Sequence, residues 1–230
     1  MKFLVFDTET TGLPKSKYIN PTTLDSWPHI VQFSYLVYDS PLNEIIDSKD
    51  FIIKMPENIL IPEESTKIHG ITNNLSNEKG TLLTVVLNEF FNSLKKVDKL
   101  IGHNIKFDIN MIKIELLRII NDQSYLPEET MHYKKYLYLI ENFDNITCTL
   151  KDSILFCNIQ SIDKNGKIYL KYPKLFELYE KLFNEIPNNL HNSFNDILVT
   201  LRCFMKLKYD IDLKDNCKSF INYSQQNCLY

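Results

Sequence analysis

Residues 2–13 of the chain have the sequence KFLVFDTETTGL, and this stretch decides the fold. Residues 3–6 are consecutive apolar, strand-forming residues, which predicts a central strand buried on both faces. Because side chains of a strand alternate with a period of two, Asp7 and Glu9 project to the same side of its end. Two acids so placed repel each other unless a cation lies between them. The structural alternative is a polar strand end, with Glu9 as a capping group and Asp7 beginning a turn.

Composition limits the class of protein. The chain has 230 residues, 44% hydrophobic and 24% charged, as expected for one globular domain. A formal net charge of -3 argues against binding nucleic acid through bulk basicity and leaves room for a local basic groove. The first apolar run is too short for a signal peptide or a membrane span, so we expect a cytoplasmic protein without a membrane partner. The 5 cysteines contain no C-x-x-C pair and predict free thiols rather than a zinc site.

Hydrophobic periodicity predicts alternating strands and helices along the rest of the chain. Strands are expected at residues 30–38, 44–54 and 99–102, and helices at 63–69, 83–94, 105–119, 174–184 and 194–209. Residues 121–129 are expected to form a loop, whereas 133–140 and 147–156 fit either a helix or a strand. Residues 210–230 form either a docked tail or a partner-binding extension.

The segment from Ser161 to Tyr172 contains Asn165-Gly166, a strong signal for a β-hairpin. Lysines and tyrosines are interleaved along it and just beyond it: Lys164, Lys167, Tyr169, Lys171, Tyr172 and Lys174. Such a hairpin could follow a phosphate backbone and stack on bases. An ordinary exposed, charged hairpin is the structural alternative, and the sequence favours it.

Two further carboxylates fall in the first turns of predicted helices. Asp108 lies in the helix after residues 102–104, and Asp196 follows His191 by five positions. On one continuous helix that separation places two residues about 140° apart, so His191 must precede the helix. Ser193 then fits the N-cap with Asp196 at N3, a pair resembling a capping box, which is the structural alternative for Asp196.

Oxygen ligands without thiolates favour hard cations, so the acids predict Mg²⁺ or Mn²⁺ rather than zinc. Two such ions about 4 Å apart are a common arrangement for phosphodiester cleavage. A histidine beside them is suited to take the proton of the attacking water, because imidazole ordinarily titrates near neutral pH.

Three segments together resemble the DEDDh, or DnaQ-like, 3′–5′ exonucleases, and most closely the branch of the DNA polymerase III proofreading subunit. They are residues 7–13 (DTETTGL), 102–108 (GHNIKFD) and 191–196 (HNSFND). Residues 27–32, 68–72 and 172–175 are similar to connecting segments of the same branch. Ser193 departs from the alanine common there.

The resemblance implies an RNase H-like α/β fold with a mixed five-stranded sheet flanked by helices. It implies that Asp7 bridges two Mg²⁺ or Mn²⁺ ions, that Glu9 and Asp196 bind the first and Asp108 the second, and that His191 is the general base. It also implies a set of contacts to the terminal 3′ nucleotide: Thr8, Thr10, Leu13, His103, Asn104 and Phe107.

The expected enzyme hydrolyses DNA from the 3′ end and releases nucleoside 5′-monophosphates, in proofreading or repair. Its expected partners are single-stranded DNA or frayed 3′ ends and, for this branch, a DNA polymerase. RNA trimming by the same site and an inactive nucleic-acid-binding module are the alternatives. The expected exonuclease domain spans residues 1–209, with 121–172 partly an elaboration, and residues 210–230 form the tail.

Overall fold

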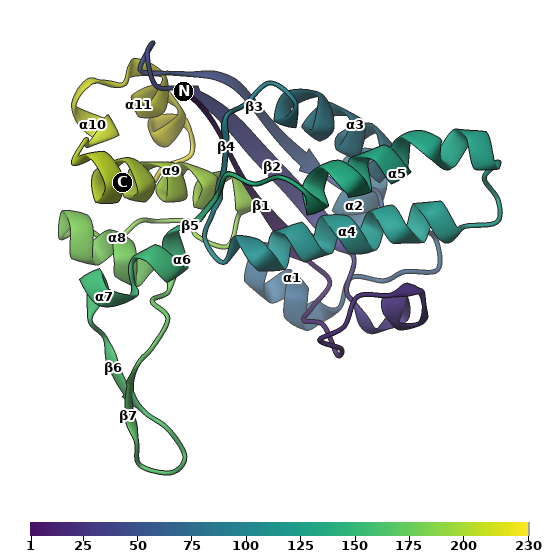
Figure 1. Ribbon diagram of the computed structural model, residues 1–230, viewed down its shortest axis with the longest axis horizontal. Coiled ribbons are helices and arrows are strands. Elements are labelled where there is room, and N and C mark those ends of the chain that lie inside the picture. The colour runs from purple at the N-terminus through teal and green to yellow at the C-terminus, as the bar shows by residue number, and fades with distance from the viewer. Residues whose placement is uncertain (230) are drawn as a thin grey trace.

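A five-stranded mixed sheet forms the centre of the computed structural model, which describes residues 1–229 (Figure 1). Its strand order is β3-β2-β1-β4-β5. The strands are β1 (Lys2–Thr10), β2 (Ile30–Asp39), β3 (Glu44–Ile52), β4 (Lys99–Gly102) and β5 (Ile146–Cys148). β1, β2 and β3 form an antiparallel meander, while β4 runs parallel to β1 and β5 parallel to β4. This is the predicted RNase H-like sheet.

Helices cover both faces of the sheet (Figure 1). The first half of the chain contributes η1 (Pro21–Ser26), α1 (Glu63–His69), α2 (Asn73–Lys79), α3 (Leu83–Leu94) and α4 (Ile105–Asn121). The second half contributes α5 (Pro127–Glu141), α6 (Thr149–Asp152), α7 (Ile154–Cys157), α8 (Leu175–Phe183), α9 (Ser193–Tyr209), α10 (Leu213–Asn216) and α11 (Lys218–Gln226). A separate hairpin consists of β6 (Gln160–Ile162) and β7 (Ile168–Leu170). Among residues 1–229, no helix combines the length and apolar character that a membrane crossing requires.

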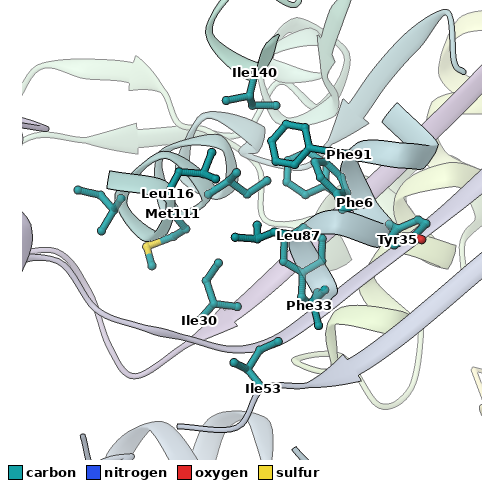
Figure 2. Close-up of a cluster of buried hydrophobic side chains, with 14 of the residues drawn as sticks. Phe6, Ile30, Phe33, Tyr35, Ile53, Leu87, Phe91, Met111, Leu116 and Ile140 are labelled. Carbon is teal, nitrogen blue, oxygen red and sulfur yellow. The ribbon is translucent and has the colours of Figure 1, made fainter. Parts of the chain in front are cut away.

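An aromatic cluster fills the core between the sheet and helices α3, α4 and α5. Phe90 is fully buried, and its ring centroid lies 5.2 Å from that of Phe6 and 5.0 Å from that of Phe33. Figure 2 shows Phe6 of the sheet beside Phe91 of α3, and Phe33 of the sheet near Leu87 of the same helix. The 3–4 spacing of apolar residues in α3 produces this face, as the sequence predicts.

The opposite face of the sheet packs against α9, which is buried along most of its length. Phe3 of β1 meets Phe204 of α9 with ring centroids 5.3 Å apart. Leu213, Cys217 and Phe220 belong to the same core and are fully buried. Of the two forms that the sequence allows for residues 210–230, the described part is therefore the docked one.

Arg202 holds this tail to α9. Its side chain is 2% exposed, and its Nε and Nη2 each donate to Asp212 at 2.7 Å. Arg202 also donates to the hydroxyl of Tyr179 in α8. Removing one partner of a buried, hydrogen-bonded ion pair leaves an unpaired buried charge, so this contact fixes where the tail lies.

Several local predictions were incomplete or wrong. Residues 127–141 form a helix, although the sequence predicts a loop for its first part, and the sequence does not indicate α2. Residues 147–156 contain both of the alternatives, since the end of β5 is followed by α6 and α7. Apolar runs shorter than about ten residues do not distinguish helix from strand without their packing partners.

Replacement of Phe220 by alanine tests whether the tail is part of the core. Because the ring is fully buried, Phe220→Ala is expected to lower the free energy of unfolding by about 3–5 kcal/mol. Urea denaturation measures it, with Leu155→Ala, at a residue that is 82% exposed, as the control. Equal unfolding midpoints for both variants would contradict the docked tail.

Candidate active site

The alternation of side chains along β1 sends its polar residues to two different helices. Val5 lies in the core on the α9 side, and Phe6 lies in the core on the α3 and α4 side. With a period of two, Asp7 and Glu9 continue the Val5 side while Thr8 continues the Phe6 side. The acids therefore point toward the start of α9, and Thr8 points toward the start of α4.

Thr8 binds Asp108 in the first turn of α4. The Thr8 backbone N–H donates to Asp108 Oδ1 at 3.0 Å, and the Thr8 hydroxyl donates to the same oxygen at 2.8 Å. Asp108 is 3% exposed. Helix α4 begins after Asn104, whose φ of 62° is a left-handed conformation that asparagine tolerates well. In this structure Thr8 serves to position Asp108; a contact with the nucleotide remains a prediction.

Helix α9 begins differently from the sequence prediction. Asn192, not Ser193, is the N-cap, and its side chain accepts from the N–H of Phe194 at 3.1 Å. Ser193 is buried instead, with its hydroxyl 2.5 Å from that of Ser34 in β2. The capping-box prediction for Ser193 and Asp196 is thus wrong, because the asparagine one position earlier makes the cap.

Glu9, His191 and Asp196 converge on one point. One ligand atom from each of the three residues lies within 4.8 Å of the others. His191 is exposed and has a φ of 65°, in the turn just before α9, where the sequence places it. Asp196 Oδ1 is buried and accepts no hydrogen bond. An unpartnered buried carboxylate oxygen beside a glutamate and an imidazole fits a divalent cation.

The acids interact strongly because they are buried together. Burial, followed by the charges of Asp108, Asp196 and Glu9, raises the pKa of Asp7 well above its usual value. Burial raises the pKa of Glu9 to about 7. Burial raises the pKa of Asp108 to about 7, although the hydrogen bonds from Thr8 oppose the shift. Burial and the charge of Glu9 raise the pKa of Asp196 to about 8. In all four carboxyl groups, burial disfavours the charged form, and an opposite charge nearby would lower these pKa values again.

His103, in the segment before α4, contacts two other segments through its ring nitrogens. Its Nδ1 lies 2.9 Å from the Thr149 hydroxyl, and its Nε2 lies 3.1 Å from the Pro173 carbonyl. Burial lowers its pKa to about 4, so the ring is neutral at pH 7. A neutral ring that bridges these groups donates from Nε2 and accepts at Nδ1. The imidazole therefore ties the end of the β6–β7 hairpin to the segment before α4.

The other residues predicted to contact the nucleotide lie just after β1 and at the start of α4, a surface that we call the rim. Leu13 is 82% exposed, Asn104 is exposed and Phe107 is half-buried. The Thr10 hydroxyl donates to the Gly12 carbonyl at 2.7 Å, which shapes the turn carrying Leu13. These positions leave Leu13 and Asn104 accessible to a ligand.

Sequence reasoning missed the polar support beneath α9. Asp50 Oδ1 in β3 accepts from Gln32 Nε2 at 2.8 Å and from the Ser34 hydroxyl at 2.7 Å. Gln32 Oε1 in turn accepts from the Ser193 N–H at 3.2 Å. The sequence signal for this network is the presence of Gln32 and Ser34, two positions apart, in the largely apolar strand β2. This network fixes the start of α9 against the sheet.

Glu115 and Arg118, which the sequence pattern does not indicate, hold the segment that follows β1. Buried Glu115 of α4 accepts from the Ile30 N–H at 3.1 Å and from Arg118 at 2.9 Å. Arg118 also donates to the carbonyls of Leu24 and Trp27. A cavity of about 470 Å³ adjoins Glu115 and Arg118. It is lined by Ile30, Ile53 and Leu83 of the core on the α3 and α4 side, so it lies away from Asp196.

Comparison with known proteins gives the family of this chain. The family model described as Exonuclease matches residues 4–204, so this chain belongs to that exonuclease family. DNA polymerase III subunit epsilon of Buchnera aphidicola subsp. Schizaphis graminum is 29% identical over 150 residues, covering 65% of this chain and 54% of that protein. The corresponding protein of Buchnera aphidicola subsp. Baizongia pistaciae is 31% identical over 126 residues, covering 54% and 47%. The chain thus spans about half the length of these relatives.

Solved structures of exonuclease I share the fold. Escherichia coli exonuclease I in complex with a dT13 oligonucleotide matches with a TM-score of 0.57 and 20% identity, over 89% of this chain and 41% of that chain. Exonuclease I of Methylocaldum szegediense matches with a TM-score of 0.58 and 18% identity, over 93% and 42%. These likenesses confirm the predicted RNase H-like architecture.

The raised carboxyl pKa values predict a stability that depends on pH. Asp196 has an ordinary pKa of 3.8 and a folded pKa of about 8, so between these values the folded chain holds protons that the unfolded chain releases. Without metal, the free energy of unfolding should therefore fall as pH rises from about 4 to about 8.

Thermal melts in chelator at pH 6 and pH 8.5 measure this loss. Asp196→Asn should lose less stability than the wild type across this interval, because the asparagine does not titrate. Asp25→Asn, at an exposed aspartate, is the control and should behave as the wild type does. An equal loss in all three proteins would contradict the assigned electrostatics.

Proposed function

We propose that this chain is a metal-dependent 3′–5′ exonuclease that hydrolyses DNA and releases nucleoside 5′-monophosphates, in proofreading or repair. The observation that carries the proposal is the convergence of Glu9, Asp196 and His191, with Asp7 and Asp108 buried in the same field of negative charge. The family match over residues 4–204 supports it. The proposed catalytic region is residues 1–209, with 121–172 partly an elaboration and 210–230 a tail.

Two Mg²⁺ or Mn²⁺ ions are the proposed cofactors. Asp7 would bridge them, Glu9 and Asp196 would hold one, and Asp108 the other. When bound, such ions activate water and stabilise the charge that develops on a transferring phosphate. The unpartnered Asp196 Oδ1 supports a cation here, and ligands that are all carboxylate oxygens, without a thiolate, favour Mg²⁺ or Mn²⁺ over zinc.

His191 is the proposed general base. One of its ring nitrogens lies within 4.8 Å of a carboxylate oxygen of Glu9 and one of Asp196, while its side chain is exposed. It can therefore take a proton at an imidazole nitrogen from the attacking water and pass that proton to solvent.

The rim would receive the terminal nucleotide. Leu13 presents an exposed apolar side chain suited to wedge against a base, and Asn104 and Phe107 line the start of α4. Thr10 and the backbone at Thr8 and Glu9 would complete this surface together with His103. The Escherichia coli neighbour is described in complex with a dT13 oligonucleotide, which supports single-stranded DNA or a frayed 3′ end as substrate. The epsilon-subunit relatives support a DNA polymerase as partner. The proposed location of such a DNA-processing enzyme is the cytoplasm.

Degradation of end-labelled substrates tests the proposal. Single-stranded DNA with a 5′ label should shorten to a ladder, and a 3′ label should appear first as mononucleotide. Activity should require Mg²⁺ or Mn²⁺ and stop in chelator. Asp7→Asn and His191→Ala should each lower the rate by about 100-fold or more, since they remove a metal ligand and the base.

His132→Ala on α5 is the matched control for His191→Ala and should retain the wild-type rate. Single-stranded RNA and mismatched duplex DNA run in parallel define the substrate. Faster cleavage of RNA would establish the RNA-trimming alternative, and binding without cleavage in any metal would establish an inactive module. Full activity in Asp7→Asn and His191→Ala would refute the assigned site.

A further inference from the structure

The β6–β7 hairpin is the largest feature of the chain that the proposed chemistry does not use. It projects from the body of the molecule beyond α7 and α8 (Figure 1). Its strands pair in the register Ser161 with Tyr169 and Ile162 with Ile168. Ile162 and Ile168 are 68% and 62% exposed, so the arm is not packed against the core.

The arm is nevertheless well defined in shape. Asp163 Oδ1 accepts from the N–H of Asn165 at 2.8 Å and of Lys167 at 2.9 Å. Gly166 takes the left-handed φ of 80° that the turn requires. A turn held by its own hydrogen bonds presents the flanking side chains in a fixed arrangement, which lowers the entropy lost on binding a ligand.

The charge of the arm is opposite to that of the acid cluster. Lys164 and Lys167 are exposed, and neither has an ion-pair partner within the part of the chain that the structure describes. Lys171, by contrast, pairs with Glu177 at 2.5 Å at the base of the arm. The chain has a net charge of -3, and its buried acids repel phosphate. A nucleic acid therefore needs a local source of positive charge, which these two lysines supply.

Two aromatic side chains lie on the same arm. Tyr169 and Tyr172 are 47% and 61% exposed. Exposed aromatic rings stack on the bases of single strands without regard to sequence. Lysines interleaved with accessible tyrosines match the backbone and the bases of a single strand together.

The base of the arm is fixed to the segment that leads into α4, the helix that carries Asp108. The Pro173 carbonyl lies 3.1 Å from His103 Nε2, and His103 precedes the helix that carries Asp108. At about 3.3 Å per residue, the extended path from Pro173 to Gly166 spans roughly 20 Å. The arm can thus follow a strand for several nucleotides beyond the one bound at the acids.

We propose that the β6–β7 hairpin is a binding surface for single-stranded DNA on the 5′ side of the terminal nucleotide. Lys164 and Lys167 contact its phosphates, and Tyr169 and Tyr172 stack on its bases. This inference rests on the proposed exonuclease function. Residues 160–172 would then bind the substrate, which an ordinary exposed hairpin does not do.

Fluorescence anisotropy with a 5′-labelled, 20-nucleotide single-stranded DNA tests the inference, in chelator to prevent cleavage. Lys164→Ala/Lys167→Ala should weaken binding by about tenfold at low salt and lower the slope of log affinity against log salt by about 1.4, or about 0.7 per lost phosphate contact. Tyr169→Ala/Tyr172→Ala should weaken binding by roughly fivefold or more with the slope unchanged. Lys134→Ala/Lys135→Ala, two exposed lysines of α5, is the matched control and should bind as the wild type does.

Cleavage of a four-nucleotide DNA with Mg²⁺ gives a second readout. This substrate uses only part of the arm, so the cleavage rate of the hairpin variants should fall less on it than on the 20-nucleotide strand. Hairpin variants that match the lysine control on the 20-nucleotide strand would overturn the inference and leave the nuclease proposal intact. If the wild type neither binds nor cleaves DNA, both proposals fall. Loss of binding restricted to an RNA of the same sequence would overturn the assignment to DNA.

Discussion

The alternating direction of side chains along β1 is the constraint on which the rest of the site depends. Because β1 is the central strand, each of its faces meets a different helix layer. Asp7 and Glu9 therefore meet the start of α9, while Thr8 holds Asp108 of α4 through two hydrogen bonds. A shift of one residue in the register would exchange these faces and separate the four acids. The same register that buries the apolar residues of β1 thus assembles the acid cluster.

The burial of several carboxylates close together is the second consequence of the alternation along β1, and it is electrostatically unfavourable. The fold gathers four carboxylates around the end of the central strand β1 and buries them, which raises the pKa of each. The polar network of Asp50, Gln32, Ser34 and Ser193 keeps α9 in place against their repulsion. A ligand that carries positive charge would offset the repulsion among these carboxylates, which is why we propose that they bind divalent cations.

The sequence predicted the parts of this structure that local patterns determine. The apolar run of β1, the amphipathic stripe of α3 and the Asn165-Gly166 turn each specify their own conformation, and all three were correct. Residue types and their spacing indicated the acids as candidates, and the structure brings three of the candidate residues together, Glu9, His191 and Asp196. The resemblance to the exonuclease family supplied the fold, which the comparisons confirm.

What the sequence could not supply depends on residues that are distant along the chain. The true cap of α9 is Asn192, because Ser193 finds a partner in Ser34, 159 positions earlier. Arg118 and Arg202, the two arginines of the chain, each bind segments whose position only the fold defines. The double hydrogen bonding of His103 likewise joins three segments that no local pattern relates. Contacts of this kind carry no periodic signal.

Calorimetric titration with Mn²⁺ tests most directly whether β1 and α9 build a cation site. The wild type should bind Mn²⁺ saturably near pH 7.5, with release of protons from the raised carboxyl groups and competition by Mg²⁺. Asp196→Asn should weaken binding by about tenfold or more, whereas Asp25→Asn should leave it unchanged. Absence of saturable binding to the wild type, or equal affinity in the two variants, would contradict the account.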